Sequence, residues 1–278
     1  MSRERWQRWG LFALAAAIVA VVLFPVYWMF VTSVLPSSLV LSRSPPLLPP
    51  PDAMSFAAYA EVFRRRPVFT WLLNSTIVVV GSVTISLFIS TLAGYSLSRF
   101  RSPAQRVAGG ALLLSKMLPG SLIVIPFFVM FTTVHLIDSL FGLMLANVAV
   151  GVPFATWMMK GFFESVPNDL EDAARIDGAS RLGAMVRVVL PLVLGGLVAT
   201  AVFIAIGAWN EFLFALMLTT STGSRTWPVG LQLMVGEFQL PWGSLAAGGI
   251  ISIVPVMVLF ALVQRALVRG LTAGAVKG

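Results

Sequence analysis

Cysteine is absent from the 278-residue sequence, and histidine occurs only once, at His135. Without cysteine the chain has no disulfide, no thiolate zinc site and no cysteine nucleophile. A single histidine excludes any metal site built from several histidines. Only 11% of the residues are charged, whereas an ordinary soluble domain has about a quarter. These shortages exclude a soluble globular protein and a disulfide-stabilised domain.

Hydrophobic residues make up 58% of the chain, and the mean hydropathy is +0.92. They gather in long runs with few or no charged residues. A helix needs roughly 20 apolar residues to cross about 30 Å of hydrocarbon, and six runs are long enough or nearly so. We therefore predict an all-α, polytopic membrane protein with six transmembrane helices. The predicted spans cover residues 11–34, 71–97, 107–132, 139–159, 192–218 and 243–267.

Prolines mark an outer loop and a distorted span. The loop covers residues 35–70, and its proline-rich stretch 44–51 cannot be helical because proline lacks the amide donor. Residues 55–63 then place aromatic side chains at helical spacing, which predicts a short helix on the membrane surface. The third span contains Pro119 and Pro126, so we predict that it is kinked and faces protein.

Lysine and arginine are distributed unevenly between the two sides of the predicted bundle. With both termini in the cytoplasm, thirteen of the 19 fall in cytoplasmic segments and five in outer loops, while Lys116 lies within the third span. Cytoplasmic segments carry such an excess in membrane proteins, so we predict cytoplasmic N- and C-termini. The net charge of +8 therefore reflects membrane topology, and we expect no nucleic-acid partner.

The most informative polar segment lies between the fourth and fifth spans. Asn168 or Asp169 can cap a helix whose first turn is acidic, which favours the helix dipole. Gly178 stands where that helix would end in a left-handed cap, and Ser180 can cap a second helix. This helix–turn–helix is too short to bury much surface alone, so we expect it to dock into a partner.

The same segment resembles the EAA loop of binding-protein-dependent ABC importer permeases. The family pattern of Glu-Ala-Ala, then Gly, then Ile-x-Leu-Pro maps onto Asp172-Ala173-Ala174, Gly178 and Val188-x-Leu190-Pro191. Asp172 and Val188 depart from it. Further stretches are similar to the second permease of maltose-type carbohydrate importers. They are Tyr59, Asn74-Ser75, Ala93-Gly94-Tyr95, Met117-x-Pro119, Trp209-Asn210-Glu211 and the ending Gly270–Gly278.

The resemblance implies an ABC importer type I permease fold, as one transmembrane domain over residues 1–278 in a bacterial cytoplasmic (inner) membrane. It implies a cytoplasmic coupling loop over residues 161–191 and a cytoplasmic tail over residues 270–278. The implied partners are a second, paralogous permease, two ATPase subunits, an extracytoplasmic solute-binding protein and the lipid bilayer. ATP and Mg would be held by the ATPase subunits, and this chain would be no enzyme and carry no cofactor. In agreement, it has no G-x-x-x-x-G-K-[ST] phosphate loop.

Three groups of residues are candidates for function, and none is catalytic or metal-binding. The ATPase-coupling candidates implied by the resemblance are Glu171, Asp172, Ala173, Ala174, Asp177, Gly178, Ala179 and Pro191. Candidates for an ATPase contact in the tail are Gly274, Val276 and Lys277. Candidates for the translocation path are Asn147, Asn210 and Glu211.

The path candidates have structural alternatives. Buried amides more often join helices than bind solutes, and Glu211 lies far enough along its span to reach the outer interface. His135 and Asp138 are explained by a solvated loop and a helix cap.

The predicted function is a permease subunit of an ATP-driven importer for a sugar or disaccharide. Importers of sugar alcohols or glycerol-phosphate-type solutes are the alternative within this class. A secondary transporter or channel is the alternative class, but it should place coupling charges at mid-membrane. A membrane-embedded enzyme would need a catalytic constellation that a chain with one loop histidine lacks.

The topology can be tested because the chain has no native cysteine. Single cysteines at Ser44 and Ser139 should react with an impermeant thiol reagent added to intact cells, whereas a cysteine at Ser180 should be protected. Labelling at Ser180, or protection at Ser44, would invert the predicted orientation.

Overall fold

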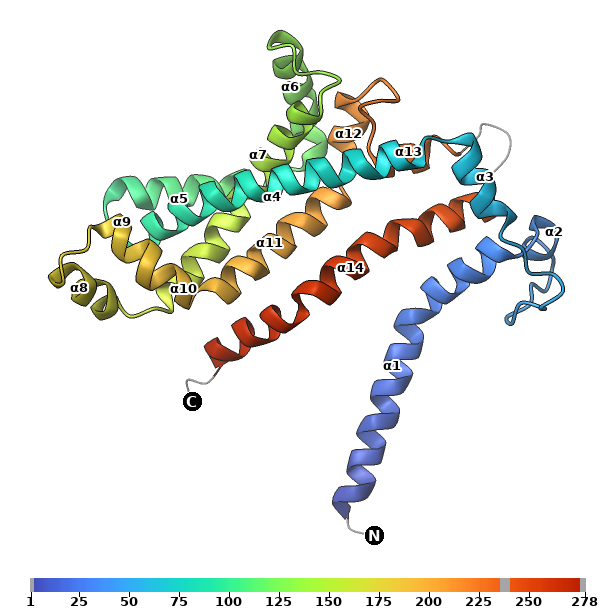
Figure 1. Ribbon diagram of the computed structural model, residues 1–278, viewed down its shortest axis with the longest axis horizontal. Coiled ribbons are helices and arrows are strands. Elements are labelled where there is room, and N and C mark those ends of the chain that lie inside the picture. The colour runs from blue at the N-terminus through green and yellow to red at the C-terminus, as the bar shows by residue number, and fades with distance from the viewer. Residues whose placement is uncertain (1–2, 236–240, 276–278) are drawn as a thin grey trace. The chain divides into compact units, whose positions relative to one another are not determined.

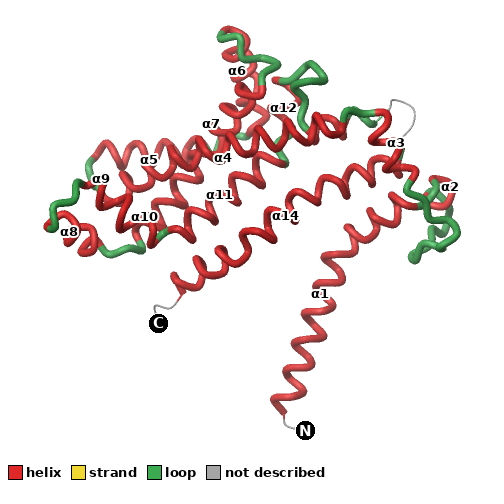
Figure 2. The backbone as a smooth tube through the Cα atoms, viewed as in Figure 1, coloured by secondary structure: helices red, strands yellow, loops and turns green. Residues whose placement is uncertain are grey.

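The computed structural model describes residues 3–235 and 241–275, and every regular element in these ranges is a helix (Figures 1 and 2). The chain divides into two compact units, residues 1–68 with 230–255 and residues 69–229 with 256–278. The all-α prediction is therefore confirmed. We describe each unit separately.

The first unit contains the long N-terminal helix and the outer loop. Its helices are α1 (Arg3–Val34), α2 (Ser37–Val40), α3 (Ala57–Arg65) and the first part of α14 (Trp242–Ala275). The helix predicted after Ser55 is thus α3, and the Tyr59 hydroxyl lies 2.9 Å from Ser33 Oγ at the end of α1. A position for α3 on the membrane surface stays a prediction.

The second unit contains the predicted second to fifth spans. Its helices are α4 (Val68–Arg99), α5 (Pro103–Ser115), α6 (Gly120–Thr133), α7 (Leu140–Glu164), α8 (Asn168–Ile176), α9 (Arg181–Ala184), a π-helical turn (Met185–Val189), α10 (Leu190–Leu192), α11 (Leu194–Trp209), α12 (Leu213–Leu218) and α13 (Trp227–Gln232). Helix α7 packs against α5, α11 and α12 and buries ten of its residues. The second unit is therefore organised around α7.

Four helical segments of the described chain are long and apolar enough to cross a membrane: Gln7–Val34, Val68–Arg99, Leu140–Glu164 and Trp242–Gln264. Two further pairs qualify only when each pair is taken together. Pro103–Ser115 with Gly120–Thr133 bends by 104°, and Arg181–Leu192 with Leu194–Trp209 bends by 79°. The chain thus has six candidate spans if each bent pair counts as one.

The third span is broken and not simply kinked. Helix α5 ends at Ser115, and α6 begins after Pro119, the residue at its N-cap position. Pro126, in contrast, lies inside α6 without ending it. Lys116 occupies the break, and its Nζ donates a hydrogen bond to the Val150 carbonyl on α7. Proline 119 therefore ends one helix and starts another, because it offers no amide to continue the first.

The fifth span is also shorter than predicted. Helix α11 ends at Trp209, and residues up to Phe212 interrupt the helical path before α12 begins at Leu213. The Glu211 carboxylate accepts hydrogen bonds from the backbone N–H groups of Phe214 (2.7 Å) and Ala215 (2.9 Å). A side chain that bonds the first free amides of a helix stabilises a new helix start. This break cannot be recognised from hydropathy, because the residues on both sides of it are apolar.

Close contact between α4 and α7 depends on a glycine. A Cβ added to Gly94 would lie 2.7 Å from Met159 Cβ and 2.9 Å from the Lys160 backbone nitrogen. Backbone atoms cannot move away as a flexible side chain can, so Gly94 allows the two helices to approach.

Gly94→Ala should therefore lower stability by about 1–3 kcal/mol through overpacking. Gly207→Ala on α11 is the matched control, because an added Cβ there meets nothing within 4 Å. It should be neutral or raise stability by up to about 1 kcal/mol through helix propensity. Thermal unfolding of the detergent-purified chain measures both. Equal midpoints for the two variants would contradict this packing.

Candidate functional site

The helix–turn–helix expected between the fourth and fifth spans is formed by α8 and α9. Gly178 has a φ of +90°, the left-handed conformation that ends α8, and Ser180 Oγ accepts a hydrogen bond of 3.1 Å from the Gly183 N–H. The N-cap expectation for Asn168 or Asp169 was wrong, because Pro167 holds the N-cap position and no side chain caps it. Proline suits this place, since a helix start needs no donor from it.

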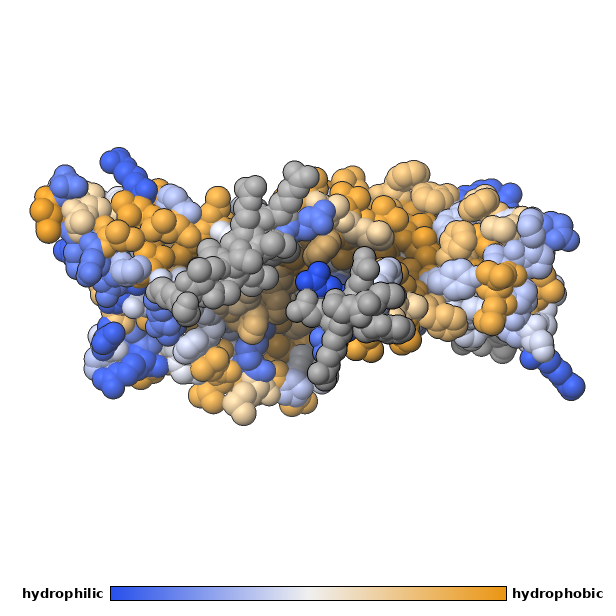
Figure 3. Space-filling view, turned by 90° about the horizontal axis from the view of Figure 1, so that it is seen from below, coloured by the Kyte–Doolittle hydropathy of each residue, from blue (hydrophilic) through white to orange (hydrophobic). Residues whose placement is uncertain are grey.

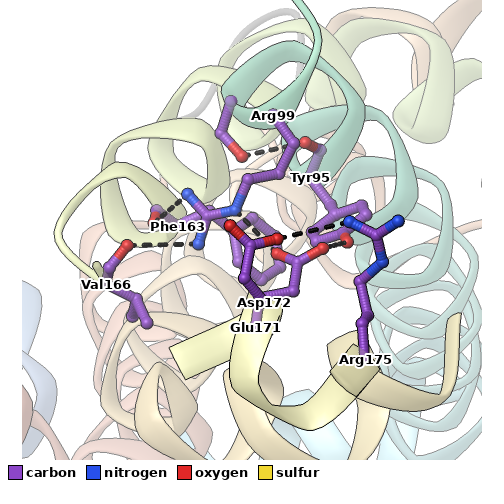
Figure 4. Close-up of polar contacts among 8 residues, drawn as sticks. Tyr95, Arg99, Phe163, Val166, Glu171, Asp172 and Arg175 are labelled. Atoms are coloured by element: carbon purple, nitrogen blue, oxygen red, sulfur yellow. Dashed lines mark hydrogen bonds and ion pairs between the residues drawn. The ribbon is translucent and has the colours of Figure 1, made fainter. Parts of the chain in front are cut away.

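Glu171 on α8 is buried and points toward the end of α4 (Figure 4). Its Oε2 lies 3.0 Å from Arg99 Nε, and its Oε1 accepts a hydrogen bond from the Tyr95 hydroxyl. Arg99 also donates to the carbonyl of Phe163 (3.0 Å) and to that of Val166 (3.2 Å). We call Tyr95, Arg99 and Glu171 the α4–α8 anchor.

The anchor joins α8 to a hydrophobic core. The Tyr95 ring meets the Phe163 ring edge to face, with centroids 5.6 Å apart. Around them lies one buried cluster, which comprises Tyr95, Met159, Phe163, Val166, Met185, Val189 and Val193. This cluster draws on α4, α7, the π-helical turn and the start of the fifth span. A displacement of α8 is therefore coupled to all these elements through packed side chains.

Asp172, the next residue, lies in a different environment. Its Oδ1 pairs with Arg175 Nη1 at 3.2 Å, and the Asp172 and Arg175 side chains are 61% and 43% exposed. Such surface pairs contribute between zero and about 1 kcal/mol. Asp172 therefore remains available to a partner.

Apolar side chains near Asp172 are also uncovered. Ile176 is 86% exposed and Leu170 is 45% exposed on α8, and Leu182 on α9 is 61% exposed. Ala173 is exposed and Ala174 is half-buried. Exposed apolar groups on a segment with charged neighbours are typical of a protein-docking surface. We call Leu170, Ala173, Ala174 and Ile176 the α8 docking face.

The remaining coupling candidates lie at the end of α8 or beyond it in the chain. Asp177 is exposed at the C-cap of α8, Ala179 is half-buried in the turn, and Pro191 is exposed in α10. Glu171, in contrast, is buried and directed toward α4, and its role in coupling stays a prediction. Of the tail candidates, Gly274 belongs to α14, while Val276 and Lys277 lie outside the described residues.

Sequence reasoning missed Tyr95 and Arg99 as members of the site. Arg99 was assigned only to the count of cytoplasmic cations, and Tyr95 only to a family resemblance. The available signal was their spacing of four residues at the end of a long helix, which places both on one face. That spacing does not identify Glu171 as their partner.

The translocation-path candidates are not brought together as one site. Asn147 is buried, and its Nδ2 donates to the Leu143 carbonyl of its own helix at 2.9 Å. Asn210 bonds the Ile206 carbonyl in the same way at 2.9 Å. Glu211 caps α12, as described above. Both amides bond a carbonyl one turn earlier in their own helix, and Glu211 bonds the start of the next one, so these contacts differ from the helix-to-helix and interface roles named as alternatives. A role in solute passage stays a prediction for all three residues.

Asp138 and Ser139 were both expected as caps of α7, and Ser139 is the one that caps it, by accepting from the Gly142 N–H at 3.3 Å. Asp138 instead accepts hydrogen bonds from the N–H groups of Thr220 (2.7 Å) and Ser221 (2.8 Å) and from the Ser224 hydroxyl. Burial alone would raise the Asp138 pKa, but these hydrogen bonds outweigh it and hold the pKa well below its usual range. Asp138 thus joins two outer loops.

Among the residues that the structure describes, His135 belongs to no cluster of metal-ligating side chains. Within the described ranges, no group of three or more histidine, aspartate or glutamate side chains could hold a metal ion.

Comparison with known proteins gives one family. Residues 86–273 match the family described as "Binding-protein-dependent transport system inner membrane component". The sulfoquinovosyl glycerol transport system permease protein SmoH of Agrobacterium fabrum is 35% identical over 266 residues, covering 95% of this chain and 93% of that protein. The trehalose transport system permease protein SugB of Mycobacterium tuberculosis is 35% identical over 280 residues, covering all of both chains.

A solved structure shares the fold. It is a bacterial ABC transporter involved in the import of the acidic polysaccharide alginate, with a TM-score of 0.79 and 24% identity over 95% of this chain and 98% of that one.

The α4–α8 anchor can be tested against its exposed neighbour. Glu171→Gln removes the charge that balances the buried Arg99 guanidinium, and breaking a buried pair costs about 3–5 kcal/mol. Asp172→Asn makes the same chemical change at an exposed pair and should cost less than about 1 kcal/mol. Thermal unfolding and the rate of trypsin cleavage after Arg175 in the purified chain measure the difference.

Glu171→Gln should unfold at a lower temperature and be cleaved faster, while Asp172→Asn should match the parent in unfolding. Indistinguishable behaviour of the two variants would mean that the anchor does not hold α8.

Proposed function

Because the chain belongs to the family of inner membrane components of binding-protein-dependent transport systems, we propose that it is the permease subunit of an ATP-driven importer for a carbohydrate. The observation that carries the coupling role is the α8 segment, which is fixed internally by Glu171 and presents an exposed face externally. No phosphate loop occurs in the sequence, so ATP and Mg are bound by separate ATPase subunits in this proposal.

In the proposed mechanism, the ATPase moves the spans by contacting α8. A ligand shifts a conformational equilibrium only if its contacts differ between the two states. The α8 docking face would sit in an ATPase cleft whose position changes with ATP binding, with Asp172 pairing there with a basic residue. The anchor then passes the displacement to α4, and the chain itself passes it to α7 and the fifth span. The broken third and fifth spans supply helix ends that can tilt without a whole helix moving.

The carbohydrate assignment is supported by the relatives. Their names state transport of sulfoquinovosyl glycerol, of trehalose and of diacetylchitobiose, all glycosides or oligosaccharides. Sugar alcohols or glycerol-phosphate-type solutes are the second candidate. The family description supports a solute-binding protein as partner. We further propose a paralogous second permease, two ATPase subunits and a tail over residues 270–278 that contacts them.

The solute class can be tested with the binding protein that copurifies with the full transporter. Its thermal unfolding midpoint should rise with a disaccharide or oligosaccharide, and that sugar should stimulate ATP hydrolysis by the reconstituted complex. Stimulation by an amino acid or a metal ion, with none by any sugar, would overturn the carbohydrate assignment.

The coupling role predicts the effect of two substitutions. An added Cβ at Gly178 meets nothing within 4 Å, so Gly178→Val acts through the strain of a β-branched residue at positive φ. The left-handed backbone conformation costs residues other than glycine roughly 1–2 kcal/mol. A free-energy difference of this size lowers the population of the docked geometry about tenfold. Ala174→Glu places an unpaired charge in the proposed cleft.

Both variants should insert normally and lose at least about tenfold of sugar-stimulated ATP hydrolysis, in proportion to that population change. Gly178→Asn is the matched control, because asparagine tolerates the left-handed region, and it should retain most activity. Reduced pull-down of the ATPase by a variant would show that its defect lies in the docking step. Full ATPase retention and stimulation in both Gly178→Val and Ala174→Glu would exclude α8 as the coupling element.

A further inference from the structure

A groove of about 960 Å³ opens beside the α4–α8 anchor, at the end of the second unit that carries α8. Its walls come from the end of α4, most of the length of α5, the end of α7 and the turn before α8. Among the residues that line it are Arg101, Arg106, Leu113, Trp157, Lys160 and Glu164. In the view of Figure 3, hydrophilic side chains gather at the end of the second unit that carries α8 and α9.

The groove carries positive charge that nothing in the described chain neutralises. Arg99 is paired with Glu171, and Lys160 is paired with Glu164 at 2.6 Å. Arg101 and Arg106 are exposed and form no ion pair with any described carboxylate. Glu164 is the single acidic residue of the lining. Two guanidinium groups are therefore free to bind an anion.

Trp157 adds an aromatic ring to the lining of the groove. Its Nε1 is itself buried, so the ring and not the N–H is available to a molecule in the groove. Lys160 Nζ lies 5.0 Å from the centre of the same ring. A tryptophan beside basic groups is also typical of the membrane–water boundary.

The adjacent surface is apolar. On α5, Val107 is 73% exposed, Leu113 is 50% exposed and Leu114 is 65% exposed. Leu113 belongs to both the groove and this apolar strip. An anion with a hydrocarbon part would contact both the basic groove and the apolar strip on α5, whereas a soluble anion would contact only the groove.

We propose that the groove binds an anionic phospholipid from the leaflet on the α8 side. Arg101 and Arg106 contact the phosphodiester oxygens, and the acyl chains lie along α5. Basic pockets between membrane helices bind anionic headgroups by the same charge pairing. The groove shares Arg99 and Val166 with the anchor region, so the bound lipid supports the position of α8.

The test uses the full chain in nanodiscs of phosphatidylcholine that contain roughly a fifth of phosphatidylglycerol. At this content the neutral lipid remains in excess. Native mass spectrometry after delipidation counts retained lipids. The parent should retain phosphatidylglycerol over phosphatidylcholine. The Arg101→Gln/Arg106→Gln variant should bind it about 5- to 30-fold more weakly, since each basic residue near the surface contributes a few-fold.

The matched control is Arg64→Gln/Arg66→Gln, which removes the same charge from exposed residues outside the groove and should retain the lipid. Equal retention of phosphatidylcholine, or displacement of the lipid by inorganic phosphate at millimolar concentration, would overturn the proposal. The proposal would also be overturned if the Arg101→Gln/Arg106→Gln variant retained the lipid but no longer pulled down the ATPase, because the groove would then be an ATPase contact. These readouts do not depend on the transported solute.

Discussion

The buried ion pair between Arg99 and Glu171 determines how the rest of the second unit is arranged around α8. Two charges removed from water are stable only when their remaining hydrogen bonds are made, and here Tyr95 and the Phe163 and Val166 carbonyls make them. Because these partners belong to α4 and the end of α7, α8 cannot rotate without breaking the cluster. That restraint directs Glu171 inward and leaves the α8 docking face uncovered. The proposed coupling function depends on this division between an internal and an external face of one short helix.

Two of the predicted spans are broken within apolar runs of the sequence. At Pro119 the chain ends α5 and starts α6, and at residues 210–212 it ends α11 and starts α12. Free backbone groups are costly where water is excluded, and Glu211 satisfies two of them at α12. Glu211 is therefore explained by the break itself. Asp138 has a corresponding role outside the spans, where it holds residues 220–224 against the loop before α7.

The anchor and the proposed lipid groove lie next to each other at the end of α4. Arg99 faces Glu171, while Arg101, two residues later, faces the groove. Nearby, Arg181 of α9 lies 4.7 Å from the ring centre of Phe100, which joins the second half of the helix–turn–helix to the same turn. One short stretch of basic and aromatic residues thus contacts the helix–turn–helix on one side and lines the proposed lipid groove on the other. A lipid bound there and an ATPase bound to α8 would act on the same structural element.

The sequence by itself determined the class of the protein. The length of each hydrophobic run and the uneven distribution of charged residues between runs decide whether a segment crosses a bilayer and in which direction. It also determined the α8–α9 turn, since the left-handed Gly178 and the Ser180 cap depend on neighbouring residues. Only the tertiary structure decided that Glu171 faces Arg99, 72 residues away, and that Asp138 binds Thr220, 82 residues away. Periodicity places a side chain on a face of its own helix but does not identify the helix opposite. For the same reason the groove, built from four separate segments, could not be read from hydropathy, which averages over neighbours along the chain and carries no information on contacts across it.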